Sequence, residues 1–200
     1  MSKLTMAEQF TLRAMTGRVV GEALANFYEV KGGLGIVTNK TFICASLVGA
    51  VEATFLSLRR GLAKISTAMM EKPEEAKEAV KLLKDMEMVM LGYGGELGGE
   101  ENYALTKAFL KAAAEEGLTS DLFFHVRIWL PAFVQRAMEE DEKIASYLKG
   151  KKLGTFTFDL DRGVFLFYNV KVDEEGKVTL KLISEVPISL EHLDLLKRSL

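Results

Sequence analysis

The chain has 200 residues, of which 48% are hydrophobic and 27% charged, and its formal net charge is −2. A chain of this length can bury a sizeable core without disulfides or metal ions. Cys44 is the only cysteine, which excludes an intrachain disulfide and a structural zinc site built on several thiolates. A reducing, cytoplasmic location is the prediction that follows.

Composition also argues against membrane and nucleic-acid partners. The best membrane candidate, 42–58, is shorter than the roughly 20 apolar residues of a span and contains Glu52. The first residues lack the apolar run of a secretory signal. Basic residues form no dense stripe, since Arg59-Arg60 is the only adjacent arginine pair. The 21 Glu and 18 Lys against 2 Gln and 4 Asn are typical of a hyperthermophilic source.

Two long helices are predicted in the first third of the chain, over residues 4–28 and 39–70. Glycine inside a helix costs about 0.5–1 kcal/mol relative to alanine, so glycines there indicate a packing reason. We expect the two helices to cross closely along small residues spaced four apart. These are Gly17, Gly21 and Ala25 in the first helix, and Ala45, Gly49 and Ala53 in the second.

Three further helices are predicted between residues 73 and 148. They cover 73–91, 100–116 and about 119–148, and Pro131 should kink the last one or divide it in two, because proline has no N–H to donate. The glycine-rich segment 92–99 is predicted to be a mobile loop between helices. It lacks the lysine and hydroxyl residue of a P-loop and follows no convincing strand, so a phosphate site is not expected.

After residue 150 the hydrophobic period changes from helical to two-residue. Three antiparallel strands are predicted, over 155–160, 164–172 and 178–182, followed by a short helix after Ser189. The predicted fold is α+β, with five or six helices packed against a C-terminal three-stranded antiparallel β-meander and a short terminal helix. The helical bundle of residues 1–150 and the meander plus C-terminal helix of 151–200 are expected to pack as one domain.

Candidate reactive side chains are few and scattered. His125 lies one turn before Trp129. A histidine side chain ordinarily titrates near neutral pH, so this residue could serve as a general acid or base. Glu22 and Glu52 interrupt apolar segments, and two inward-facing carboxylates would mark a proton-transfer or metal site. The alternatives are a histidine stacked on Trp129 and glutamates paired with arginines. Cys44 is expected to be a buried hydrophobe, and no cofactor or metal is expected.

Phe165 and Phe167 carry the main functional hypothesis. Both are expected on the strand face opposite the buried one, and a strand that is apolar on both faces is either sandwiched or exposed for association. We therefore expect a non-catalytic interaction or homo-oligomeric protein, with these two residues at its interface, rather than an enzyme. The alternative is a small-molecule binding protein or enzyme with an apolar interhelical pocket, using His125, Trp129, Glu22 or Glu52.

Overall fold

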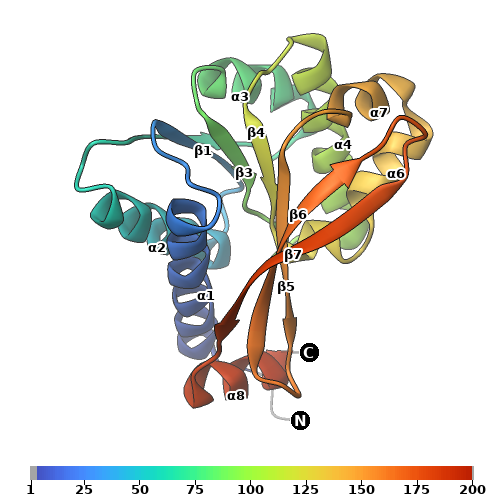
Figure 1. The fold of residues 1–200 in the computed structure, drawn as a ribbon. Coiled ribbons are helices and arrows are strands. Elements are labelled where there is room, and N and C mark those ends of the chain that lie inside the picture. Colours follow the sequence, from blue (N-terminus) through green and yellow to red (C-terminus); the bar gives the residue numbers. More distant parts are fainter. Residues whose placement is uncertain (1–3, 200) are drawn as a thin grey trace.

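The protein forms one seven-stranded sheet in the computed structural model, which describes residues 4–199 (Figure 1). The strand order is β2-β1-β3-β4-β5-β6-β7. The first five strands along the chain are parallel, whereas β6 and β7 run antiparallel to their neighbours. The strands are β1 (Gly33–Thr38), β2 (Lys64–Met69), β3 (Met88–Leu91), β4 (Asp121–Phe124), β5 (Leu153–Asp159), β6 (Val164–Val172) and β7 (Val178–Pro187).

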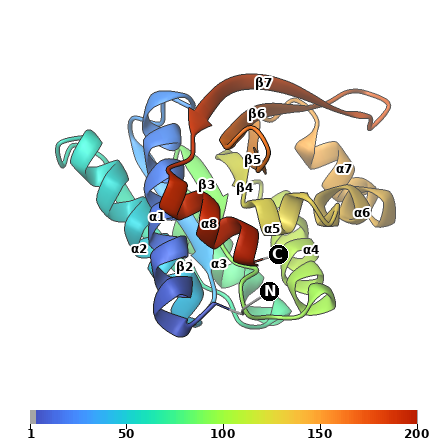
Figure 2. The same ribbon diagram turned by 90° about the horizontal axis from the view of Figure 1, so that it is seen from below.

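Helices cover both faces of this sheet and enclose a hydrophobic core on each side. One core contains side chains of α1, α2 and α8, and the other contains side chains of α3, α4, α6 and α7 (Figures 1 and 2). The helices are α1 (Met6–Asn26), α2 (Phe42–Leu58), α3 (Ala76–Leu83), α4 (Gly99–Glu115), α5 (Val126–Trp129), α6 (Phe133–Glu140), α7 (Glu142–Leu148) and α8 (Leu190–Ser199).

The predicted close crossing of the first two helices is confirmed. A Cβ added at Gly17 would lie 2.8 Å from Cβ of Ala50 and closer still to the carbonyl oxygen of Leu47. A Cβ at Gly21 would lie 2.8 Å from the carbonyl oxygen of Val51. The predicted partner ridge is wrong, however, because Gly49 has no neighbour within 4 Å of the position of a Cβ.

The predicted helical bundle is wrong, because four parallel strands run through residues 1–150. Residues 64–69, expected inside the second helix, form β2, and residues 88–91, expected to end the third helix, form β3. β1 lies between the first two predicted helices, where no strand was expected, and β4 replaces the start of the helix expected over 119–148. Every residue of β1 and β3 is buried. Strands covered on both faces lack polar–apolar alternation, so periodicity alone does not separate them from buried helix.

A break near Pro131 is confirmed, since α5 ends at Trp129 and α6 begins at Phe133. Ala132, between them, has a left-handed backbone with φ 60°. This break separates α6 from α5, which is a short helix directly after β4.

The three predicted C-terminal strands are present as β5, β6 and β7, but they extend the large sheet rather than form a meander of their own. β5 pairs with β4 in parallel, with Phe123 opposite Gly154. β6 pairs with both β5 and β7, with one irregularity between Phe167 and Tyr168. The expected helix after Ser189 is α8. A division of the chain at residue 150 stays a prediction.

Candidate functional site

The carboxyl ends of β1, β3 and β4 lie at one edge of the sheet, because these strands are parallel. α2, which follows β1, packs on one face of the sheet, whereas α4, which follows β3, packs on the other. Open α/β sheets bind ligands at such a switch point, outside the carboxyl ends of the strands. Figure 2 views this edge from below, with α8 lying across it.

Arg13 lies at this edge because α1 packs closely against α2 at Gly17, one turn after Arg13. Gly17 packs on the backbone of Leu47, so the preceding turns of the two parallel helices also meet. Arg13 and Cys44, in these turns, line one small cavity together with Gly95 and His125. The cavity measures about 10 Å³, which is room for about one water molecule.

A larger hollow of about 260 Å³ adjoins the small cavity and shares Arg13 and Gly95 with it. Its other polar lining includes Gln9, Arg127 and Arg198. Pockets for drug-sized ligands span about 300–1,000 Å³, so this hollow suits a smaller molecule. Three arginines therefore line one hollow at the carboxyl edge.

His125 follows β4 directly and caps α5. Its Nδ1 accepts the backbone N–H of Arg127 at 3.3 Å, and the side chain is 4% exposed. Burial, together with the positive charges of Arg13 and Arg127, lowers the pKa of His125 to about 3. The imidazole is therefore neutral at pH 7. Since Nδ1 accepts, the ring proton is assigned to Nε2, which makes that nitrogen a donor.

Arg13 and Arg127 stand apart from the other arginines at this edge because they have no acidic partner. Arg198 pairs with Glu8 and with Asp194. Arg13 and Arg127 form no ion pair with any residue from 4 to 199. Arg13 is half-buried; burial lowers its pKa, and the charge of Arg127 lowers it further. Arg13 is half-buried and Arg127 is exposed, and neither has an acidic partner among residues 4–199, so the arrangement is suited to receive an anion.

The glycine-rich segment after β3 brings the parts of the site together. Gly94 has φ +117°, and a Cβ there would lie 2.7 Å from Cβ of Arg127. A Cβ on Gly95 would lie 2.9 Å from Ile43 Cγ2. The segment therefore packs closely against α5 on one side and the first turn of α2 on the other, and only glycine allows this approach.

The structure does not bring the sequence-predicted ligand residues together. His125 lies in the site, but Trp129 faces the opposite core, where its ring stacks on Phe124 at 6.1 Å between centroids. Glu22 pairs with Arg18 on the surface of α1 at 3.0 Å. Glu52 accepts a hydrogen bond from the Thr67 hydroxyl on β2.

Phe165 and Phe167 are fully buried, so the exposed strand face expected for an interface is absent. Both rings pack on Phe156, at 6.0 and 5.8 Å between centroids, in the core beneath α1 and α8. The hydrophobic pattern was right about a strand apolar on both faces, but helices sandwich it. The prediction of a non-catalytic interaction or homo-oligomeric protein is therefore wrong, because the exposed aromatic strand face on which it rested is absent.

The sequence analysis does not select Arg13 or Arg127, and it does not place the glycine segment 92–99 at the site. The available signal was Gly92-Tyr93-Gly94-Gly95 directly after a short apolar run, which is typical of a strand followed by a tight ligand-binding turn. The helical pattern predicted over 73–91 hides this signal, because it includes the residues of β3.

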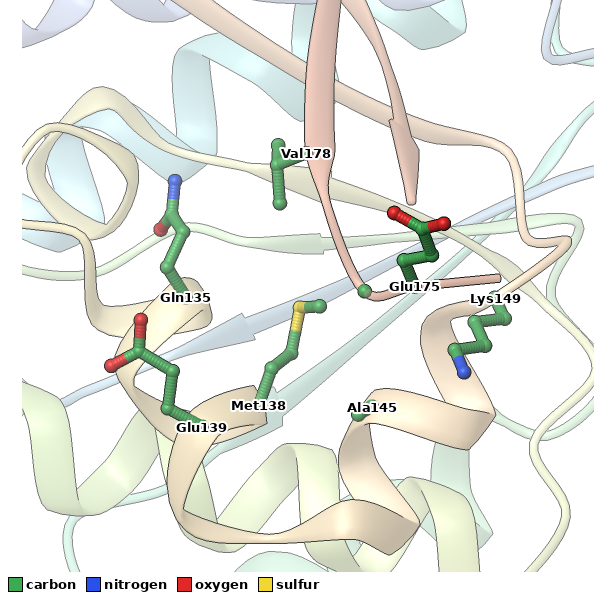
Figure 3. A pocket seen from close by; sticks show the side chains of 8 residues that line it. Gln135, Met138, Glu139, Ala145, Lys149, Glu175 and Val178 are labelled. Carbon is green, nitrogen blue, oxygen red and sulfur yellow. The ribbon is translucent and has the colours of Figure 1, made fainter. Parts of the chain in front are cut away.

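A second hollow, of about 400 Å³, lies far from this edge, between α6, α7 and the turn that joins β6 to β7 (Figure 3). Met138 and Val178 provide apolar surface, and Glu139, Lys149 and Glu175 provide charges of both signs. Although larger, this hollow is lined by charges of both signs and does not lie at the carboxyl ends of the parallel strands. We therefore regard the carboxyl edge as the candidate site.

Comparisons with known proteins define the family and the type of fold. The family described as "Uncharacterized protein" matches residues 9–195, so the chain belongs to it. No curated protein matches the sequence. The leucine-binding protein LivK of Thermotoga maritima has a similar structure, with TM-score 0.55 and 9% identity over 87% of this chain and 65% of that one. A solute-binding protein of an ABC transporter from R. palustris, in complex with benzoate, gives TM-score 0.52 and 13% identity over 88% and 64%.

At these identities the likeness concerns the fold alone. The chain spans less than two thirds of the length of either matched structure. The matched folds are not helical bundles, which agrees with the correction of the predicted fold. Among the residues described, no helix is both long and apolar enough to cross a membrane.

Proposed function

We propose that the protein binds a small molecule through a carboxylate group at the carboxyl edge of its sheet. The observation that carries this proposal is the pair Arg13 and Arg127, which lack acidic partners in the described chain and flank the neutral His125. A guanidinium group matches a carboxylate with two parallel N–H donors, which makes such pairs strong and directional.

His125 adds a neutral donor to these two charges. Its Nε2–H is suited to a carboxylate oxygen, because the ring does not need to be charged to donate. A bound anion would offset the two positive charges that lower the pKa of His125, so binding should raise that pKa. Ligand affinity and histidine protonation are thus expected to be linked.

The fold likeness supports the same class of function. One matched protein is named for leucine and the other is bound to benzoate, and both ligands carry a carboxylate. The small-molecule alternative drawn from the sequence is thereby favoured over self-association. We keep the cytoplasmic location as part of the proposal, on the ground that the single cysteine is unpaired and buried.

A matched panel of carboxylates and amides tests the proposal. Thermal unfolding is measured with benzoate, L-leucine and butyrate, and with benzamide, L-leucinamide and butyramide, because a ligand of the folded state raises the unfolding midpoint. At least one carboxylate should raise it more than its amide does. Arg127→Met should abolish this difference, whereas the control Arg162→Met, at an exposed pair with Glu185, should keep it. Equal effects of acid and amide across the panel would overturn the proposal.

A further inference from the structure

The small cavity beside Arg13 has room for a single heavy atom. Its volume of about 10 Å³ is close to that needed by one water molecule. The hydroxyl of Tyr93, in its wall, pairs with the hydroxyl of Thr106 at 3.1 Å and is therefore engaged within the fold. Four lining side chains are almost completely buried, namely Ile43, Cys44, Leu47 and Tyr93. Buried side chains are close-packed and move aside at a cost, so the cavity keeps this size.

The cavity offers hydrogen-bond donors to its occupant. His125 is 4% exposed, and among the described residues its Nε2–H has no acceptor, because the hydrogen bond of the ring uses Nδ1. The ring also makes an edge contact with Phe156 at 5.4 Å between centroids, which holds its orientation. Arg13, the second donor, lines the same cavity, and none of the described side chains around it carries a carboxylate or amide oxygen. A buried donor without an acceptor is unfavourable, so an oxygen that accepts from both groups fills the cavity best.

Gly95 and Arg13 form the passage between the cavity and the larger hollow, because both residues line the two spaces. A Cβ on Gly95 would lie 3.6 Å from Sγ of Cys44 and 2.9 Å from Cγ2 of Ile43, so a methyl group there would take up space beside the cavity. The backbone φ of Gly95 lies outside the left-handed region. The width of the passage therefore depends on the missing side chain of Gly95 and not on its backbone conformation.

We infer that this cavity receives one oxygen of the ligand carboxylate, and that Gly95 and Cys44 make the site selective for flat carboxylates against tetrahedral oxyanions. This inference rests on the proposed function. One oxygen enters the cavity and accepts from His125 and Arg13, and the second oxygen stays in the hollow with Arg127. A carboxylate and its first carbon lie in one plane, so the group passes edge-on between Arg13 and Gly95. A sulfonate carries three oxygens, and the two that stay outside the cavity project from this plane against the walls of the passage.

Pairs of anions with the same tail test this inference. Isothermal titration calorimetry of the full chain compares benzoate with benzenesulfonate and butyrate with propane-1-sulfonate, each with one negative charge at pH 7. In a pair whose carboxylate binds, the carboxylate should bind about tenfold more tightly, because it alone makes the buried charge-assisted bond. Equal affinities, or tighter binding of the sulfonate, would overturn the inference and leave the proposed function standing. Absence of binding by every carboxylate would overturn both.

Gly95→Ala supplies an independent arm at the passage. The added methyl group should weaken carboxylate binding by about tenfold and change sulfonate binding by less than about twofold, because the sulfonate does not use the cavity. Gly99→Ala is the matched control, since a Cβ there meets nothing within 4 Å, and it should change neither affinity. Equal weakening of both anions by Gly95→Ala would contradict the inference.

Cys44→Ala tests the cavity in the opposite direction and leaves the glycine segment intact. Removing Sγ enlarges the cavity, so the preference for the carboxylate over the sulfonate should fall by about threefold or more. Thermal unfolding without ligand shows which variants are folded, and this arm decides the test where Gly95→Ala does not fold. An unchanged preference in folded Cys44→Ala would overturn the assignment of Cys44 as a selectivity residue.

Discussion

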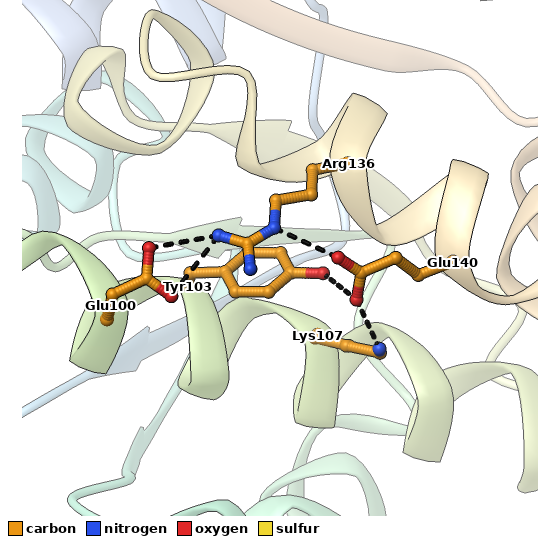
Figure 4. A network of polar contacts seen from close by, with 5 residues as sticks. All are labelled: Glu100, Tyr103, Lys107, Arg136 and Glu140. Carbon is orange, nitrogen blue, oxygen red and sulfur yellow. Dashed lines mark hydrogen bonds and ion pairs between the residues drawn. The ribbon is translucent and has the colours of Figure 1, made fainter.

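Two arginines on opposite parts of the molecule show how the same side chain serves different purposes. Arg136, on α6, donates to Glu100 and to Glu140 at 3.0 Å each, and its guanidinium lies 3.8 Å from the ring centroid of Tyr103 (Figure 4). These hydrogen bonds raise its pKa. Arg13 has no acidic partner in residues 4–199, and burial lowers its pKa.

The two arginines differ in whether the fold itself supplies their counter-charge. Glu140 in the Arg136 network also accepts from Tyr103 and Lys107, at 2.6 Å each, so every charge there is balanced within the fold and α4 is tied to α6. At the carboxyl edge Arg13 and Arg127 have no acidic partner among residues 4–199. A balanced network stabilises structure, whereas an unbalanced one indicates that the counter-charge comes from outside.

Arg13→Met should have the largest effect on ligand binding. Losing one charge-assisted pair should weaken carboxylate binding by about tenfold to a hundredfold, because such bonds contribute about 1.5–3 kcal/mol. The unfolding midpoint without ligand should stay equal or rise, since repulsion with Arg127 disappears. Titration calorimetry and thermal unfolding measure the two quantities. Arg18→Met, on the exposed side of α1, is the control; a clear loss of stability in Arg13→Met with intact binding would reverse the assignment.

Gly17→Ala should move Arg13 without deleting its charge. The added Cβ would overlap the backbone of Leu47, so α1 must shift from α2, at an expected cost of about 1–3 kcal/mol in the free energy of unfolding. Carboxylate binding should weaken as well. Gly49→Ala is the matched control, because its Cβ meets nothing within 4 Å; it should stabilise the protein by about 0.5–1 kcal/mol. Urea denaturation measures both, and equal effects would show that the close crossing is unimportant.

Acid should destabilise the protein partly through His125. Its folded-state pKa of about 3 lies below the ordinary 6.5, so the unfolded chain binds a proton more readily. The stability due to the neutral ring is complete above pH 6.5 and is lost as the pH falls toward 3, by up to about 1.4 kcal/mol per pH unit. His192, with a pKa lowered to about 4, adds to this loss.

His125→Asn, which keeps a capping side chain, should therefore lose less stability than the wild type between pH 6.5 and 4.5 in urea titrations. A saturating carboxylate should likewise flatten the wild-type curve, because the anion raises the pKa of His125. His192→Asn should reduce the acid sensitivity but keep the effect of the carboxylate. An unaltered curve on adding ligand would separate His125 from the binding site.

Arg136→Met should give the smallest effect. The bonds of Arg136 are half-exposed and screened by solvent, so the unfolding midpoint should fall only slightly. Carboxylate affinity should be unchanged, since the network lies away from the strand ends. A change in affinity would show that the two regions are coupled.

Local signals in the sequence were sufficient for some elements and not for others. The spacing of Gly17 and Gly21 predicted a close helix crossing, Pro131 predicted a break, and period-two alternation predicted the strands at the C-terminal end. β1 and β3 escaped because both faces are buried, which removes the alternation that identifies a strand. The fold class depended on these central strands, so it could not be recovered from periodicity.

The candidate site was only partly accessible from the sequence. His125 could be selected as a single residue, because a histidine in an apolar segment stands out. Arg13, Cys44 and Arg127 are distant along the chain, and they meet only because α1 crosses α2 at Gly17 and β4 lies in parallel beside β3. Absence of an acidic partner is a property of the folded molecule, and no local pattern records it.

The position of Trp129 has a practical consequence. It is the single tryptophan of the chain, it is 6% exposed, and it belongs to the four-residue helix α5 that carries Arg127. Any ligand that pulls on Arg127 should shift this short helix against Phe124, on which the indole stacks. Its intrinsic fluorescence is therefore a built-in optical reporter for occupancy of the carboxyl edge, with no label attached and no second indole to dilute the signal.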